Sequence, residues 1–197
     1  MTPPPASRPA RTRLLAAAGE LFYESGIAAT GVDAVLARAR VSPATMYAHF
    51  AGKDALVAAY LQQRFEQWRR TWDEVLAEHT DPVDRLLSLF DAVARYRERQ
   101  HNSRGCGFLA AATELPADHP GRPWLQADSR LLSDRLQELA VAAGLDDPAE
   151  VAATVLLHYD GALARSAREE TTPELSGSDP VRRARRLAAD WLATRPG

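Results

Sequence analysis

TGVDAVLARARVSPATMYAHFAGK, residues 30–53, is the stretch that decides the fold of this chain. Thr30 and Asp33 predict a helix start, because a threonine hydroxyl can accept from backbone N–H groups and an acidic residue favours the positive end of a helix. The side chains that form one apolar face at helical spacing are Val32, Val35, Leu36 and Ala39. Such a short helix is unstable alone, so the pattern also predicts packing partners.

A second helix starts directly after a tight turn at residues 40–41. Ser42 followed by Pro43 is typical of an N-cap and a first helical position. Met46 and Phe50 share one face of this helix, and short or polar side chains occupy the exposed part. Two short helices in this arrangement are typical of a helix-turn-helix that inserts its second helix into the DNA major groove. An ordinary surface hairpin of helices is the alternative.

Longer motifs extend this pattern. A first helix ends in LFYESGIAATGVDAV, and VSPATMYAHFAGKDAL matches Val-Ser-x-x-Thr/Ser-Leu/Met-Tyr-x-His/Tyr-Phe-x-x-Lys-x-x-Leu. Over residues 10–60 the chain therefore resembles the TetR family of bacterial repressors. One residue departs from the family pattern: Arg40 stands where glycine is very frequent before Val41. A non-glycine residue at positive φ is strained. If the motif differs in geometry from that of the family, we expect the difference at this turn.

The rest of the 197-residue chain predicts an all-α protein of about nine helices. Apolar residues at helical spacing predict a helix from Ala10 to before Gly26, and later a long helix that links two domains. The proline-rich start predicts a flexible arm, whose arginines could reach DNA or stay solvated. The predicted divisions are an arm over residues 1–9, a helix-turn-helix domain over 10–53, and a ligand-binding and dimerisation domain over 54–197.

Composition and charge narrow the class of protein. With 46% hydrophobic residues the chain can bury a core, and its formal charge of −2 lacks the basic character of a non-specific nucleic-acid binder. Residues 1–53 nevertheless carry six basic and three acidic side chains, so the part predicted to face DNA is basic. One cysteine, Cys106, excludes an internal disulfide, and the chain has no long apolar run and no signal-peptide core. We expect a soluble, cytoplasmic protein with no membrane partner.

The predicted DNA-binding residues lie around the second helix of the motif. Thr45 and Ala44, near its start, are short enough to meet base edges, whereas Tyr47 and Lys53 would reach phosphates. Lys53 is the only lysine of the chain. The full predicted set is Thr30, Ser42, Ala44, Thr45, Tyr47, His49 and Lys53.

The resemblance implies a C-terminal domain that dimerises and holds an inducer, but it carries no site residue over to this part of the chain. Aromatic and histidine side chains could line a mostly apolar pocket or belong to the core: Phe90, Phe108, Trp124, His158 and Tyr159. Small and apolar residues predict a two-fold dimer of the last two long helices, with packing inside their own chain as the alternative: Gly161, Leu187, Trp191 and Leu192. The histidines lack the spacing of metal ligands, so neither a metal nor a cofactor is predicted.

The resemblance also implies a ligand-responsive transcriptional regulator. We expect a repressor that binds a palindromic operator in double-stranded DNA as a homodimer and is released by a small-molecule inducer. The chain has no G-x-S-x-G, H-E-x-x-H or C-x-x-C motif, so an enzyme is not expected. The alternative is a small-molecule-binding or catalytic helical protein in which the helix-turn-helix is only scaffold.

Overall fold

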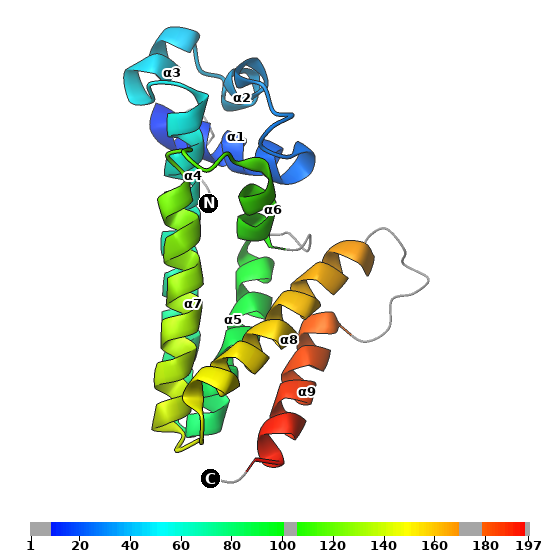
Figure 1. Ribbon diagram of the computed structural model, residues 1–197. Helices are drawn as coiled ribbons and strands as arrows, with labels where there is room; N and C mark the ends of the chain where they lie inside the picture. The colour runs from blue at the N-terminus through cyan, green and yellow to red at the C-terminus, as the bar shows by residue number, and fades with distance from the viewer. Residues whose placement is uncertain (1–8, 101–105, 170–178, 196–197) are drawn as a thin grey trace. The chain divides into compact units, whose positions relative to one another are not determined.

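The all-α architecture predicted from the sequence is confirmed. This computed structural model describes residues 9–100, 106–169 and 179–195, and within them the chain forms nine α-helices and no β-strand (Figure 1). The helices are α1 (Ala10–Ser25), α2 (Val32–Ala39), α3 (Pro43–His49), α4 (Lys53–Glu78), α5 (Pro82–Gln100), α6 (Gly107–Glu114), α7 (Arg122–Ala142), α8 (Pro148–Glu169) and α9 (Pro180–Ala193). Residues 1–8 of the predicted flexible arm lie outside the described residues.

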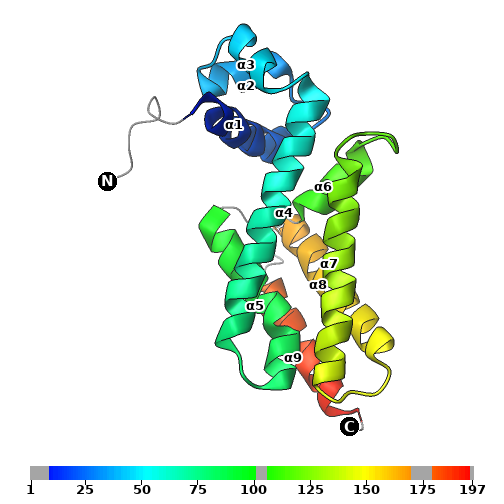
Figure 2. The same ribbon diagram turned by 90° about the vertical axis from the view of Figure 1, so that its left-hand side faces the viewer.

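Two compact units share these helices. Unit 1 contains the described residues up to Phe65 together with Gly107–Ala127, and unit 2 contains the described residues of Glu66–Cys106 and of Asp128–Gly197. The long helices α4 and α7 each continue without a break from one unit into the other (Figure 2). Packing therefore groups α6 and the start of α4 with α1, α2 and α3. The predicted division after residue 53 separates a DNA-binding part from a ligand-binding and dimerisation part. It rests on function and not on packing, and it stays a prediction.

Unit 1 is held together by apolar faces that meet between its first three helices. Leu14 of α1, Val35 of α2 and Met46 of α3 are almost completely buried, as their spacing predicts. The ring of Phe22 meets that of Tyr60 in α4 edge-on, with the centroids 5.4 Å apart. Because α2 and α3 have only 8 and 7 residues, they depend on this packing for stability. The core thus fixes which face of α3 stays outside.

Unit 2 is built around a cluster of aromatic side chains. Trp68 stacks on Trp72 with the ring centroids 5.8 Å apart, and Tyr96 of α5 meets Trp68 edge-on at the same distance. The indole N–H of Trp72 donates to the Ser88 hydroxyl at 3.1 Å, so this buried polar group has a partner. The guanidinium of Arg135 covers the Trp72 ring, 4.6 Å from its centroid. Around this cluster, α9 packs against both α5 and α8.

Aspartate residues start three helices of unit 2 at positions that the sequence predicts. The carboxylates of Asp81, Asp147 and Asp179 each accept from a backbone N–H of the turn that follows, at 2.9–3.2 Å. A proline follows each aspartate and occupies the first position of its helix, where a missing N–H costs nothing. These local signals therefore set the bounds of α5, α8 and α9.

Candidate nucleic-acid interface

The turn between α2 and α3 closes tightly although it carries an arginine. Arg40 adopts the left-handed conformation, with φ 53° and ψ 54°. Its N–H donates to the Ala37 carbonyl at 3.2 Å, and the Val41 N–H donates to the Leu36 carbonyl at 3.1 Å. These two hydrogen bonds form a Schellman motif, which normally has glycine at the left-handed position. The turn therefore has the Schellman geometry although the residue at its left-handed position is not glycine, and the backbone of Arg40 is strained.

Ser42 starts α3 as predicted. Its hydroxyl accepts from the Thr45 N–H at 3.2 Å, and Pro43 follows at the first helical position. The hydroxyl groups of Ser42 and Thr45 also share a hydrogen bond of 2.9 Å. This bond orients Thr45 at the N-terminal end of α3, the end that contacts base edges in helix-turn-helix proteins.

The outer face of α3 carries small and polar side chains, while Met46 on its inner face is completely buried. Tyr47 leaves 58% of its surface exposed, which is unusual for an aromatic residue and keeps its phenol accessible. The predicted DNA-binding residues of this segment are all exposed or half-buried: Ser42, Ala44, Thr45, Tyr47 and His49. The structure therefore brings these five together on one short surface.

Thr30 does not cap α2 as predicted. The N-cap of α2 is Gly31, without a side-chain hydrogen bond, and Thr30 is only 4% exposed. The Thr30 hydroxyl donates to the carbonyl oxygens of Gly26 at 2.6 Å and Leu21 at 3.2 Å. The prediction of a Thr30 cap was wrong, because this hydroxyl donates to carbonyl groups at the end of α1 and so ties the α1–α2 turn to that helix. A contact between Thr30 and DNA stays a prediction.

Two charged side chains bind the backbone of one residue in that same turn. Lys53 Nζ donates to the Ala28 carbonyl oxygen at 3.2 Å, and Glu114 Oε2, at the end of α6, accepts from the Ala28 N–H at 2.7 Å. An ammonium group has three donors, so Lys53 can hold the turn and bind a phosphate at once. The contact of Glu114 was missed from the sequence, because no local pattern signals a partner 86 positions away.

Arginines of α1 lie at both ends of α3. The Arg11 guanidinium is 5.5 Å from the centroid of the Phe50 ring, which follows the last residue of α3. Arg13 Nη1 donates to the carbonyl oxygen of Arg40, just before α3, at 3.2 Å. Both arginines belong to the first turn of α1, so this helix brings positive charge next to the predicted DNA-binding surface.

Arg38 differs from these basic groups because its charge is paired within the chain. Its guanidinium lies 2.8 Å from one carboxylate oxygen of Glu20 and 3.5 Å from one of Glu24. The hydrogen bond to Glu20, assisted by the charge of Glu24, raises the pKa of the Arg38 guanidinium above its ordinary value. These exposed ion pairs add little stability, but they occupy the two acidic side chains of α1.

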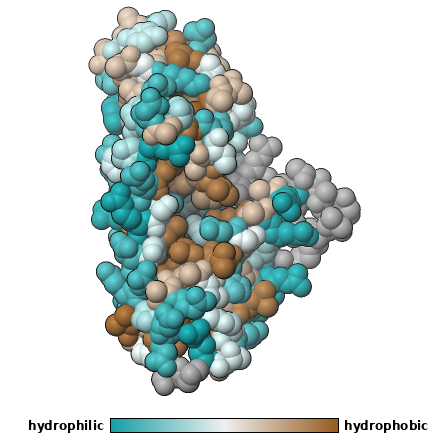
Figure 3. Space-filling view, viewed as in Figure 1, coloured by the Kyte–Doolittle hydropathy of each residue, from teal (hydrophilic) through white to brown (hydrophobic). Residues whose placement is uncertain are grey.

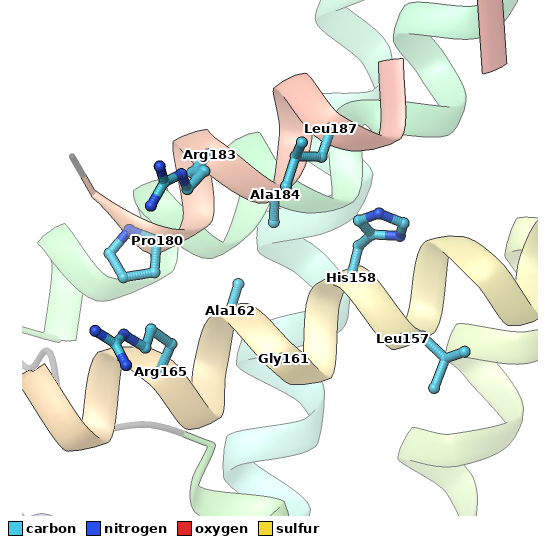
Figure 4. Close-up of a pocket in the computed structure, with 9 residues that line it drawn as sticks. All are labelled: Leu157, His158, Gly161, Ala162, Arg165, Pro180, Arg183, Ala184 and Leu187. Carbon is cyan, nitrogen blue, oxygen red and sulfur yellow. The ribbon is translucent and has the colours of Figure 1, made fainter. Parts of the chain in front are cut away.

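A second candidate surface lies on unit 2, in a groove of about 260 Å³ between α8 and α9. Ala162 and Ala184 point toward each other from the two helices (Figure 4). At the groove, Leu157 is 72% exposed and Leu187 is 51% exposed. Brown hydrophobic side chains are visible among hydrophilic ones on the face that carries these two helices (Figure 3). The pair of helices therefore has apolar surface that its own unit does not cover.

The four residues predicted for dimerisation have different surroundings. Leu187 is exposed, and Gly161 is also exposed, with no atom from outside its own stretch of helix within 4 Å of the position that a Cβ would take. Trp191 is half-buried against the core, with the Arg195 guanidinium 4.8 Å from its ring centroid. Leu192 is only 5% exposed and belongs to the core of unit 2. Leu192 thus stabilises its own chain, because the apolar stripe of α9 mostly faces inward.

The five residues predicted to line a ligand pocket fall into three different environments. Phe90 and Tyr159 are buried in the core of unit 2, which is the alternative that the sequence left open. Phe108 and Trp124 belong to unit 1. His158 is half-buried at the groove between α8 and α9, where its Nδ1–H donates to the backbone carbonyl of Thr154 at 2.8 Å. Helical spacing alone did not separate core residues from lining residues.

A capped and exposed second helix, a tight turn before it and a supporting first helix define a helix-turn-helix DNA-binding domain. The chain belongs to the TetR family of bacterial regulatory proteins. The model of that family matches residues 14–60. Over 191 residues the chain is 30% identical to the HTH-type transcriptional regulator YjdC of Escherichia coli, and the match covers 92% of this chain and 93% of YjdC.

Two further comparisons agree with this assignment. A match to the HTH-type transcriptional regulator UidR of Escherichia coli, 35% identical over 78 residues, covers 40% of this chain and only 36% of UidR. The crystal structure of a TetR-family transcriptional regulator from Streptomyces coelicolor is 28% identical, with a TM-score of 0.79 over 93% of this chain and 94% of that one. Within the described parts of the chain, no helix is both long and apolar enough to cross a membrane.

Proposed function

We propose that this protein is a transcriptional repressor that binds a palindromic operator as a homodimer and is released by a small molecule. The class is that of the family: a transcriptional regulator with a DNA-binding domain. The observation that carries operator binding is the outer face of α3, where Ser42, Ala44 and Thr45 present small side chains at the N-terminal end of the helix. Short side chains at this end allow the backbone to approach base edges closely.

Selection of duplexes from a random DNA pool tests this function. The enriched sequence should be an inverted repeat with its half-sites separated by about one helical turn or a multiple of it, as a two-fold dimer requires. A template that carries this site over its promoter should give less transcript in vitro when the protein is added. Failure to enrich any sequence would favour the alternative of a helical binding protein or enzyme that uses the motif as scaffold.

Replacement of Thr45 by alanine should change base preference more than overall affinity. The hydroxyl and the methyl group both lie at the N-terminal end of α3, and loss of a base contact costs about 1–3 kcal/mol of discrimination. The change should appear at one base pair of each half-site when affinities are measured over all single-base variants. Thr45→Val and Thr45→Ser separate the hydroxyl from the methyl contribution. An equal loss of affinity on every sequence would contradict this role.

Replacement of Lys53 by glutamine should weaken binding to all sequences alike. The amide keeps a donor for the Ala28 carbonyl but removes the only charge of the side chain, so the α1–α2 turn stays supported. Loss of one phosphate contact should lower the slope of log K against log salt by about 0.9 per protomer. Titrations at several salt concentrations measure this slope, and a Lys53→Arg control should retain it. A shift in base preference would argue against a phosphate contact.

A second copy of the chain is the proposed partner of the groove between α8 and α9. Leu157 and Leu187 expose apolar surface there, and Gly161 and Ala162 allow another helix to approach closely. A symmetric pair of these faces would bury the leucines of both copies and join two DNA-binding domains in one dimer. This arrangement supports the palindromic operator as well as the homodimer.

Release by a small molecule is proposed to act through α6. Glu114 at the end of α6 binds the Ala28 N–H, and His119 in the following connection lies 3.5 Å from Asp54 at the start of α4. A ligand that moves α6 would therefore disturb both the α1–α2 turn and α4. Such coupling is typically about 1–3 kcal/mol and reciprocal. A screen of small apolar compounds should find ones that raise the melting temperature and also release DNA.

A further inference from the structure

We propose that Arg40 binds a DNA phosphate from the turn that precedes α3, as a contact that this chain adds to the helix-turn-helix. The inference rests on the proposed function, since it needs α3 to enter the major groove. It concerns the residue that departs from glycine at the left-handed position of the turn, with φ 53° and ψ 54°. A left-handed conformation is unfavourable for an L-residue with a side chain.

The turn itself does not require an arginine. The hydrogen bonds that close it come from the backbone N–H groups of Arg40 and Val41, which glycine would supply equally well and without strain. The Arg40 side chain is exposed, and its guanidinium has no hydrogen-bond or ion-pair partner among the described residues. Strain that no local contact offsets is typical of a residue kept for function.

The position of Arg40 in the chain should place it beside the major groove of the DNA. It lies three residues before Pro43, the first residue of α3, and the N-terminal end of a recognition helix is the end that enters the groove. The major groove is about 12 Å wide and its edges are lined by phosphates, so a long side chain just before the helix reaches the backbone and not the bases. A guanidinium is well suited to bidentate contact with a phosphate.

The charges around Arg40 favour an anion from outside the chain. Arg13 donates to the Arg40 carbonyl at 3.2 Å, so a second guanidinium lies at the same turn. The two carboxylates of α1, Glu20 and Glu24, are bound to Arg38. Arg38 is thus paired with carboxylates of its own chain, while the Arg40 guanidinium, two residues later, has no such partner among the described residues. A phosphate between Arg13 and Arg40 would also relieve the repulsion between two like charges.

Three variants separate the charge of Arg40 from its strain, and a fourth is a control. Arg40→Gln removes the charge and keeps a side chain of similar length in the strained conformation, and Arg40→Lys keeps the charge. Arg40→Gly removes both charge and strain. Arg69→Gln, at an exposed position of α4 in unit 2, is the control for a loss of net charge elsewhere. Each is tested with full-length protein on a duplex selected by the wild type and on a duplex of unrelated sequence.

We expect Arg40→Gln to weaken binding of the dimer by roughly 3- to 30-fold on both duplexes, because each protomer loses one exposed ion pair. The slope of log K against log salt should fall by about 0.9 per protomer. Arg40→Lys should keep the slope of the wild type. Arg40→Gly should bind as weakly as Arg40→Gln while its melting temperature rises by about 2 °C, since the strain is gone.

Three results would overturn the proposal. Binding and salt slope of Arg40→Gln equal to those of Arg69→Gln would show that Arg40 makes no phosphate contact. A change in base preference would show a contact to bases instead, and loss of binding by Arg40→Lys with normal folding would show that charge is not what matters. If the wild type bound no duplex, both the proposed function and this inference would fail. If the wild type bound DNA and Arg40→Gln bound it equally well, only the inference about Arg40 would fail.

Discussion

Leu187→Asp should prevent formation of the proposed dimer and lower the affinity of the protein for the selected operator by about 100-fold or more. A charge at this position cannot be buried in an apolar contact with a second copy of α8 and α9 without a partner. Two half-sites bound by one dimer gain roughly 10²–10⁴ in affinity over separate binding, and a monomer loses that gain. Sedimentation equilibrium gives the mass, and titration of the operator gives the affinity.

Leu109→Asp is the matched control for this experiment. Leu109 of α6 is 52% exposed, close to the 51% of Leu187, so both variants replace an equally exposed leucine by the same charge. Trp191→Asp is a poorer choice, because that ring packs against the core of unit 2 and under the Arg195 guanidinium, and its loss would also disturb the fold. A Leu187→Asp protein that remains dimeric would place the interface elsewhere than on α8 and α9.

Met46→Ala should abolish operator binding by loosening α3 from its unit. Met46 is completely buried and is the main side chain that attaches α3 to the helices beneath it. Truncation of a buried methionine costs about 2–5 kcal/mol, which is a large fraction of the stability of an ordinary domain. Amide hydrogen exchange should show lost protection in α2 and α3, while the helices of unit 2 keep theirs.

A Met46→Leu variant provides the control, because a swap of similar volume costs less than about 1.5 kcal/mol. It should bind the operator nearly as the wild type does. Equal protection of α3 in Met46→Ala and the wild type, with operator binding intact, would mean that the buried methionine does not hold the recognition helix in place.

Local signals explain how much of the fold could be predicted. Ser42 with Pro43 fixes the start of α3, and Asp179 with Pro180 fixes that of α9, because a cap needs only residues within one turn of each other. Apolar residues every three or four positions predicted the faces of the short helices, and the buried Met46 agrees with them. The four exposed positions and the half-buried Thr45 around α3 follow from the same local pattern.

The remaining features depend on contacts between distant residues, which periodicity does not contain. Thr30 was predicted as a cap, but its hydroxyl binds carbonyl groups at the end of α1. Leu192 was predicted at an interface, but α9 turns it into the core of unit 2. The hydrogen bond from the Ala28 N–H to the Glu114 carboxylate joins segments 86 positions apart. In each case the residue type can be read from the sequence, but its partner depends on how distant helices pack against each other.

The aromatic cluster of unit 2 has a consequence for spectroscopy. Trp68 and Trp72 stack on each other, and Trp191 packs against the same core, so three of the four tryptophans report on unit 2. The fourth is Trp124 in α7, and the chain has no tryptophan before Trp68. No indole therefore lies in α1, α2 or α3. A melting curve followed by intrinsic fluorescence would therefore report mainly on unit 2, and Trp124, whose ring centroid lies 5.8 Å from that of Phe65, would be the one indole that reports on the unit containing the DNA-binding helices.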